Sequence, residues 1–179
     1  GSVGSVKGKS INIAISPNGK IADMTEAGTL TYYISGSGES NLSQTISDFF
    51  PVLPVNPVKQ GDTWKLTDST MTSSPSTTMK ITDNSENKFE GLETVNGIEC
   101  AKITSTHSGI WTMSIKSPEA DLMIKGPYTS TSECLFAIKE GYFLKNTSST
   151  RLTGQLELTS PMVMTMPITI DMKSVTEAK

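Results

Sequence analysis

The chain has little net charge and lacks the long apolar runs that mark several common protein classes. Its 179 residues carry a net charge of −3, from 15 basic and 18 acidic side chains. A protein that binds nucleic acid needs clustered Lys and Arg to neutralise phosphates, and the sequence has no basic stripe. No stretch approaches the roughly 18–20 consecutive apolar residues of a membrane-spanning helix. We therefore expect neither a nucleic-acid partner nor a transmembrane segment in this chain.

Residues typical of catalytic and metal sites are also scarce. His107 is the only histidine, and no G-x-S-x-G, H-E-x-x-H or calcium-loop spacing occurs. His107 stands directly before Ser108-Gly109, a pair typical of turns, so we expect an exposed loop histidine. The sequence thus predicts no catalytic residue, no metal site, no cofactor and no enzymatic activity.

Cysteine is limited to Cys100 and Cys134, which both lie in apparent strands. A disulfide between them would stabilise the fold by about 3.5–4 kcal/mol in the chain-entropy model. Free cysteines, however, usually behave as small buried hydrophobic residues. Both alternatives stay open from the sequence, and two free thiols are the preferred one.

The long runs of Ala, Leu, Glu, Lys and Arg that are typical of helical proteins are missing. Ser and Thr instead make up about a quarter of the chain, and apolar residues alternate with polar ones. Asn96-Gly97 is a strong hairpin signal, and a bend is expected at Lys139-Glu140-Gly141. The pattern predicts about ten to twelve antiparallel strands. They are expected at residues 10–16, 20–26, 29–35, 63–69, 77–83, 87–95, 97–106, 110–116, 132–146, 151–159 and 162–172.

One helix is expected, over residues 41–54. Its apolar residues recur at helical spacing, and Pro51 and Pro54 end it. A helix of about ten residues is only about 15 Å long and cannot cover the apolar face of so many strands. The sheet must curl on itself, dimerise or leave a cavity. We predict a mainly β fold in which a strongly curved antiparallel sheet, a half-barrel, carries one short amphipathic helix. Residues 1–179 are expected to form one domain, trimmed at its N-terminus, with residues 1–2 as an expression scar.

Methionine recurs at every second position near the end of the chain, at Met162, Met164 and Met166. Ile168 continues the phase, and isoleucine binds no metal, so a copper site is not favoured. A dry core and an adaptable apolar pocket both fit the pattern. If a pocket is present, we predict that its ligand-binding residues are Phe49, Trp111, Met113, Met162, Met164, Met166 and Ile168.

Three stretches carry a resemblance to known proteins: "FFPVLPVNPVKQGDTW", "VNGIECAKI" and "AIKEGYFLKN", followed by the methionine-rich final hairpin. They resemble a family of uncharacterised bacterial envelope proteins with the phrase P-x-x-P-V-x-x-G-D-x-W after a short helix. The layout is similar to that of the LolA, LolB and LppX lipoproteins, whose curved sheet forms a half-barrel closed by helices. The resemblance implies a secreted, periplasmic or outer-membrane-attached protein, often lipid-anchored through an N-terminal cysteine that this chain lacks.

Two functions follow as expectations. The first is a non-enzymatic cell-envelope protein that binds a hydrophobic small molecule or a lipid-like amphiphile on the concave face of the sheet. The alternative is a structural module with a filled core, whose partner is another envelope protein.

Overall fold

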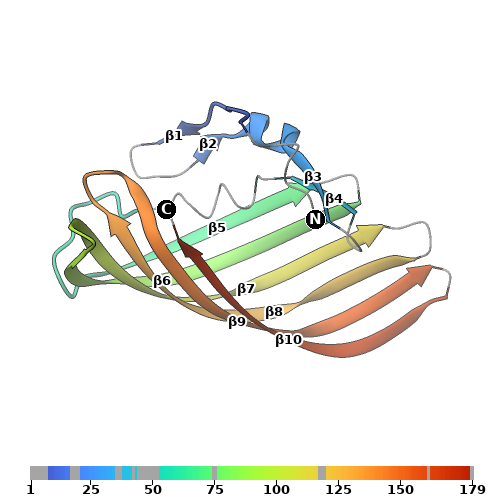
Figure 1. The fold of residues 1–179 in the computed structure, drawn as a ribbon. Coiled ribbons are helices and arrows are strands. Elements are labelled where there is room, and N and C mark those ends of the chain that lie inside the picture. The colour runs from blue at the N-terminus through green and yellow to red at the C-terminus, as the bar shows by residue number, and fades with distance from the viewer. Residues whose placement is uncertain are drawn as a thin grey trace.

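The structure of the chain is a computed structural model, and it describes residues 8–16, 21–34, 38–41, 43, 53–73, 76–116, 120–160 and 162–177. The described part is mainly β, as the alternation of apolar and polar residues predicted. Six long strands form one antiparallel sheet in the order β10-β9-β8-β7-β6-β5 (Figure 1). Each strand therefore pairs with its neighbour in sequence. The strands are β5 (Thr63–Ser73), β6 (Thr77–Val95), β7 (Ile98–Lys116), β8 (Asp121–Ala137), β9 (Tyr142–Ser160) and β10 (Met164–Glu177).

The N-terminal part forms two small separate sheets. One pairs β1 (Ala14–Ile15) with β2 (Ile21–Asp23), and the other pairs β3 (Thr31–Ile34) with β4 (Gly38–Asn41). A single 3-10 element, η2 (Thr25–Thr29), connects them. The hairpin expected from the two segments around the Pro-Asn-Gly turn is present, but its first strand has only two residues where seven were expected. The turn itself, residues 17–19, lies outside the described residues.

The central strands are longer than the sequence predicted. The expected strands 77–83 and 87–95 are one strand of 19 residues, β6, and 97–106 and 110–116 are one strand of 19 residues, β7. At about 3.4 Å per residue, each spans roughly 60 Å. Residues 84–86 were left between two expected strands and Ser108-Gly109 was predicted to be a turn, yet these stretches pair directly with each other: Asp83 with Gly109, and Ser85 with His107. The prediction that His107 lies in an exposed loop is therefore wrong, because it lies in the middle of a central strand.

Two predicted turns are confirmed. Asn96 and Gly97 connect β6 to β7 with φ angles of 51° and 80°, the left-handed conformations that a tight type I′ hairpin requires. Gly141, with φ of 78°, precedes β9 at the expected bend. Most of the predicted helix over residues 41–54, with Phe49, lies outside the described residues. Among its described residues, Asn41 is the last residue of β4 and Ser43 is helical, whereas Leu53 and Pro54 at the predicted C-terminal end are not helical.

Apolar side chains pack on both faces of the sheet. Among the described residues, Leu152 has the largest fully buried apolar side chain, at 1% exposure. Another buried cluster, around Cys100, Leu135 and Ala137, lies next to the β6–β7 hairpin. Both cysteines are free and buried. Cys134 pairs with Ile103, and because side chains alternate along a strand, Cys100 faces the other side of the sheet.

Candidate functional site: a cavity with a polar centre

A cavity of about 550 Å³ opens on one face of the six-stranded sheet. We call this face, which carries Asp83, His107, Tyr128 and Ser132, the inner face. Of the six strands of this sheet, all except β10 contribute to the lining, and Leu53 adds a side chain from the segment before β5. The lining residues are Leu53, Trp64, Leu66, Thr67, Asp68, Ile81, Asp83, Ser85, Asn87, Ile103, Ser105, His107, Trp111, Tyr128, Ser130, Ser132, Cys134, Phe143, Asn146, Ser148 and Thr150.

The centre of the inner face is polar because the strand register brings polar residues of several strands together. Residues directly opposite each other in antiparallel strands share a face. One row across the sheet consists of Ser85, His107, Ser130 and Thr150, and the next consists of Asn87, Ser105, Ser132 and Ser148. We call these eight residues, together with Asp83, the polar band.

Hydrogen bonds connect much of the polar band. Ser105 donates its hydroxyl to Asn87 Oδ1 at 2.6 Å, and Asn87 Nδ2 donates to Ser85 Oγ at 3.1 Å. The hydroxyls of Ser130 and Thr150 lie 2.7 Å apart. These bonds offset the cost of placing hydroxyl and amide groups on a partly buried surface.

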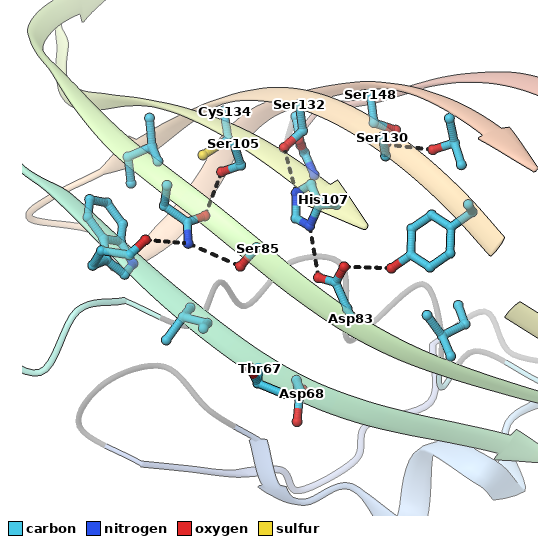
Figure 2. A pocket seen from close by; sticks show the side chains of 18 of the residues that line it. Thr67, Asp68, Asp83, Ser85, Ser105, His107, Ser130, Ser132, Cys134 and Ser148 are labelled. Carbon is cyan, nitrogen blue, oxygen red and sulfur yellow. Dashed lines mark hydrogen bonds and ion pairs between the residues drawn. The ribbon is translucent and has the colours of Figure 1, made fainter. Parts of the chain in front are cut away.

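His107 connects three strands at the centre of the band (Figure 2). Its Nδ1 lies 2.8 Å from Asp83 Oδ2, and its Nε2 lies 3.2 Å from Ser132 Oγ. Tyr128 donates its hydroxyl to Asp83 Oδ1 at 2.6 Å. An ionised carboxylate only accepts hydrogen bonds, so Nδ1 of His107 carries a hydrogen, and in the neutral ring Nε2 accepts from Ser132.

This network controls the ionisation of its members. Burial favours the neutral form of Asp83, but hydrogen bonds from His107 and Tyr128 and the charge that His107 can carry outweigh burial. The pKa of Asp83 therefore lies below its ordinary value of 3.8. Burial and the hydrogen bond to Asp83 raise the pKa of the Tyr128 phenol. Burial also raises the pKa of the Cys134 thiol to about 12. At neutral pH the cavity thus contains an anionic Asp83, a phenol and a protonated thiol.

Apolar surface flanks the polar band on both sides. On the side of the β6–β7 hairpin, Ile103, Cys134 and Phe143 line the cavity. A neighbouring hollow of about 490 Å³ lies between residues 53–58 and the apolar side chains of Phe89 and Phe136. On the other side, Ile81 and Trp111 pair across β6 and β7, and Trp111 contacts Tyr128 edge-on at 6.3 Å between ring centroids. The polar centre therefore lies between two apolar regions of one surface.

The structure places the predicted ligand-binding residues in different regions. Trp111 lines the cavity. Met113, Met164 and Met166 lie on the inner face beyond Trp111, where Met113 pairs with Ile124 and Met166 pairs with Leu156. Ile168 lies in the same row of the sheet as Trp111.

None of the described cavities is lined by these four residues or by Met162. Met162 precedes β10 and is 63% exposed, and Met164 is 40% exposed. Phe49 lies outside the described residues. Trp111 therefore lines the cavity together with the polar band, whereas the methionines line none of the described cavities.

Sequence reasoning missed the polar band. The expected strands were broken near the centre of the band, although one signal was available: the polar stretches of neighbouring strands lie at nearly equal distances from the Asn96-Gly97 hairpin. Asp83 is 13 residues before Asn96, and Gly109 is 12 residues after Gly97. A single bulge at Phe89/Gly91 accounts for the difference. Two stretches at equal distances from a hairpin turn lie side by side if both strands continue through them. The spacing therefore indicated two long paired strands rather than two turns.

Three polar atoms in the cavity lining are buried and have no hydrogen-bond partner: Trp64 Nε1, Trp111 Nε1 and Asn146 Oδ1. Two are donors and one is an acceptor. Buried polar atoms in folded proteins are nearly always paired, so an unpaired group needs an explanation.

Comparisons of the chain with protein-family models, with curated proteins and with solved structures find no significant match. The described residues contain no group of three or more His, Cys, Asp or Glu side chains that could hold a metal ion. Among the helices of the described part, none is long and apolar enough to cross a membrane.

Proposed function

We propose that the protein is a non-enzymatic cell-envelope protein that binds an amphiphilic ligand on the inner face of its sheet. The observation that carries this proposal is the cavity of about 550 Å³, in which a polar band lies between two apolar regions. An amphiphile has the same arrangement, with a polar group joined to an apolar chain. Ligand cavities in proteins are commonly of this size and combine apolar walls with a few polar groups.

A half-barrel shape, similar to that of the LolA, LolB and LppX lipoproteins, belongs to the proposal. Its support is a set of three glycines, Gly109, Gly126 and Gly154, on neighbouring strands. A Cβ atom added at any of them would collide with the backbone of an adjacent strand. Glycines at such close approaches let a sheet bend sharply. A bend across β7, β8 and β9 would wrap the inner face around a ligand.

The cell-envelope location is carried by the sequence resemblance alone. The location and the binding are tested with one preparation, the protein purified from its native source. An envelope protein that carries lipid should retain a lipid of that envelope. Native mass spectrometry of the freshly purified protein is expected to show an additional mass that organic solvent releases.

A pair of variants tests the location of binding. Ser132→Trp places a large side chain in the middle of the cavity, whereas Thr131→Trp places the same side chain on the opposite face of the same strand. A fluorescent dansyl-labelled undecanoic acid is expected to bind the wild type and Thr131→Trp and to lose at least about tenfold in affinity for Ser132→Trp, because the added side chain fills the space of the ligand. Circular dichroism confirms that both variants fold. Equal binding by both variants would contradict the proposed site, and absence of any ligand would favour the interaction module with a filled core.

One observation favours a second candidate function, acyl transfer. The hydrogen bonds join Ser132, as a nucleophile, to His107, as a base, and His107 to Asp83, as the group that orients the base. Ser132, however, lies in β8, which is paired with β7 and β9 on its two sides. The backbone N–H groups around Ser132 are therefore directed into the sheet and cannot stabilise an oxyanion in the cavity.

The missing oxyanion stabilisation makes binding the better proposal. A fluorophosphonate probe that labels the wild type, but neither Ser132→Ala nor His107→Gln, would establish acyl transfer and overturn the non-enzymatic function. Unlabelled wild type is the expected result.

A further inference from the structure

The six-stranded sheet is open, and its two edge strands are β5 and β10. An edge strand presents backbone N–H and C=O groups that can pair with another chain. At the start of β5, residues 54–56 line a hollow of about 590 Å³ together with residues 63–66. β10 has 14 residues and lies along the opposite margin, where it pairs with β9 alone among the described strands (Figure 1). The edge of β10 is therefore the better candidate for pairing with another chain.

Pro167 indicates which residues of β10 direct their backbone groups to the free edge. It pairs with Gln155 of β9 in a register without a shift. Proline has no N–H, so within a sheet it occupies positions where that group would point away from the neighbouring strand. Because these directions alternate along an antiparallel strand, the odd-numbered residues of β10 direct their N–H and C=O groups away from β9. Asp171 and Lys173 can thus form backbone hydrogen bonds with a further strand.

The same two residues place opposite charges next to each other on this edge. Their side chains share the outer face, which lies opposite to the inner face. Asp171 is 67% exposed, and its contact with Arg151 is 3.7 Å long. Lys173 is exposed and belongs to none of the ion pairs between described residues. Val175, the next residue on this face, is 60% exposed. An added strand would supply both charges with partners and cover this apolar side chain.

The charges select a register for pairing with a second copy of β10. Two antiparallel copies related by a two-fold axis keep a common outer face if the axis passes through one residue of the strand. With the axis at Met172, Asp171 of each copy lies opposite Lys173 of the other, which is favourable. An axis at Asp171 or at Lys173 places like charges opposite each other. Shifting the axis by two residues from Met172 places Asp171 opposite Thr169 or Glu177 and pairs no opposite charges.

The register centred on Met172 also pairs most of the strand. It overlaps residues 167–177 of both copies, and the Met172 side chains meet on the inner face at the axis. An axis at Val175 would pair Lys173 with Glu177, but it would overlap only residues 173–177. Glu177 also already contacts Lys145 at 2.8 Å. The longer overlap favours the axis at Met172.

We propose that two copies of the chain associate through β10, in an antiparallel pairing with Met172 at the two-fold axis. Ion pairs between Asp171 and Lys173 fix the register, and backbone hydrogen bonds join the two sheets into one. The inner faces then continue across the axis. β10 contributes no residue to the cavity lining, so the association leaves the cavity open and does not depend on the proposed function.

Charge reversal on β10 tests this association. Asp171→Lys places like charges opposite each other at both ion pairs, and Lys173→Asp does so with the opposite sign. The double variant Asp171→Lys/Lys173→Asp restores complementarity, and so does a mixture of the two single variants. Lys65→Asp reverses an exposed charge on β5 and is the matched control. Sedimentation velocity at about 5–500 µM protein compares each mass with the 19.2 kDa of one chain.

The wild type and Lys65→Asp are expected to dimerise with a dissociation constant on the order of 10 µM, because the paired area is small. Each single reversal on β10 is expected to raise this constant at least about tenfold. The double variant and the mixture are expected to return it to within about threefold of the wild type. Circular dichroism confirms that the variants fold.

A disulfide across the axis tests the register. Directly opposite residues of a non-hydrogen-bonded pair have Cα atoms about 4.5 Å apart, within the range of about 4.4–6.8 Å for a disulfide. Met172 occupies such a position, so Met172→Cys is expected to form a disulfide-linked dimer on oxidation. Ser174→Cys lies on the same face, but its two copies would be roughly 14 Å apart and should not react with each other. The native Cys100 and Cys134 are buried.

Four results would overturn the proposal. A wild type that stays monomeric at the highest concentration would exclude the association. A dimer that the β10 reversals leave intact, or that only Lys65→Asp weakens, would place the contact elsewhere. Masses that grow beyond a dimer would indicate head-to-tail pairing of β10 with β5. Loss of the dimer without rescue in the double variant and the mixture, or cross-linking of Ser174→Cys instead of Met172→Cys, would refute the ion pairs and the register.

Discussion

The hydrogen-bond network around Asp83 makes a prediction about stability and its dependence on pH. Asp83→Asn keeps the shape of the side chain but removes its charge and one of its two acceptor oxygens. In the wild type these oxygens accept from Tyr128 at 2.6 Å and lie 2.8 Å from His107 Nδ1. If the remaining oxygen of the amide accepts from Tyr128, its Nδ2 faces Nδ1 of His107, and the ring must adopt its other tautomer. The change therefore disturbs both hydrogen bonds of the His107 ring, the one with residue 83 and the one with Ser132.

The expected loss of stability follows from these contacts. A hydrogen bond to a charged group contributes about 1.5–3 kcal/mol net. The side chains of Asp83 and His107 are 25% and 26% exposed, and solvent screens part of the interaction. We expect Asp83→Asn to lower the free energy of unfolding by about 1–2 kcal/mol, which corresponds to a fall in Tm of about 2–8 °C for a domain of this size.

The stability difference between the wild type and Asp83→Asn should disappear in acid. Because the pKa of Asp83 is lowered in the folded protein, its contribution to stability is present above the ordinary pKa and is lost as the pH falls through the lowered one. Urea unfolding of wild type and variant between pH 7 and pH 2 measures this difference. The difference is expected to be constant from pH 7 to about pH 5 and to shrink below about pH 4.

Asp68 of β5 pairs with Asp83, so Asp68→Asn is measured alongside to separate its titration. Asp171→Asn, at an ion pair of 3.7 Å with both side chains about two-thirds exposed, is the control and should change little. A wild-type advantage over Asp83→Asn that stays the same down to pH 2 would refute this account of the network.

Three further predictions concern other parts of the sheet. Without a reductant, Cys100 and Cys134 should resist a thiol reagent in the folded protein, because both are buried. In guanidinium two thiols per chain should react, and no reaction there would indicate a disulfide. Leu152→Ala should cost about 2–5 kcal/mol in urea unfolding, whereas Met164→Asp, at a position that is 40% exposed, should cost less than about 1 kcal/mol; the reverse order would place the methionines in a dry core. Gly126→Ala should cost about 1–3 kcal/mol, because the added Cβ collides with the backbone of β9, and a neutral effect by thermal unfolding would count against a sharp bend there.

The sequence predicted the β class and the alternation of the final hairpin correctly, because both depend on local pattern. The register pairs Leu158 with Met164 and Leu156 with Met166, so the residues of the methionine alternation share one face with leucines of β9. The Asn96-Gly97 turn was equally readable, since few dipeptides adopt two consecutive positive φ angles. These features need no knowledge of which distant residues meet.

The cavity and its polar band depend on contacts between strands that are distant in sequence, so local alternation could not predict them. A polar stretch inside a strand and a polar turn have the same composition, and turns are the more common place for residues such as Asn84, Ser108 and Gly109. The strand continues through them because both neighbouring strands supply backbone partners along its whole length. Backbone pairing on both sides outweighed local turn propensity, as often occurs for central strands.

The polar band also bears on the two alternatives that the methionine pattern left open. A core that is filled by its own side chains gains stability from apolar contacts, and hydroxyl groups at its centre would reduce that gain. Here the centre of the inner face consists mainly of serine, threonine, asparagine, histidine and aspartate, and the half-buried Trp64, Trp111 and Asn146 each keep one buried polar atom without a partner. The exposed Met164 lies at the edge of this face rather than at its centre. An inner face that is apolar at its ends, polar in its middle and incompletely hydrogen-bonded is poorly suited to be a dry core, and it is better suited to contact a ligand that is itself part polar and part apolar.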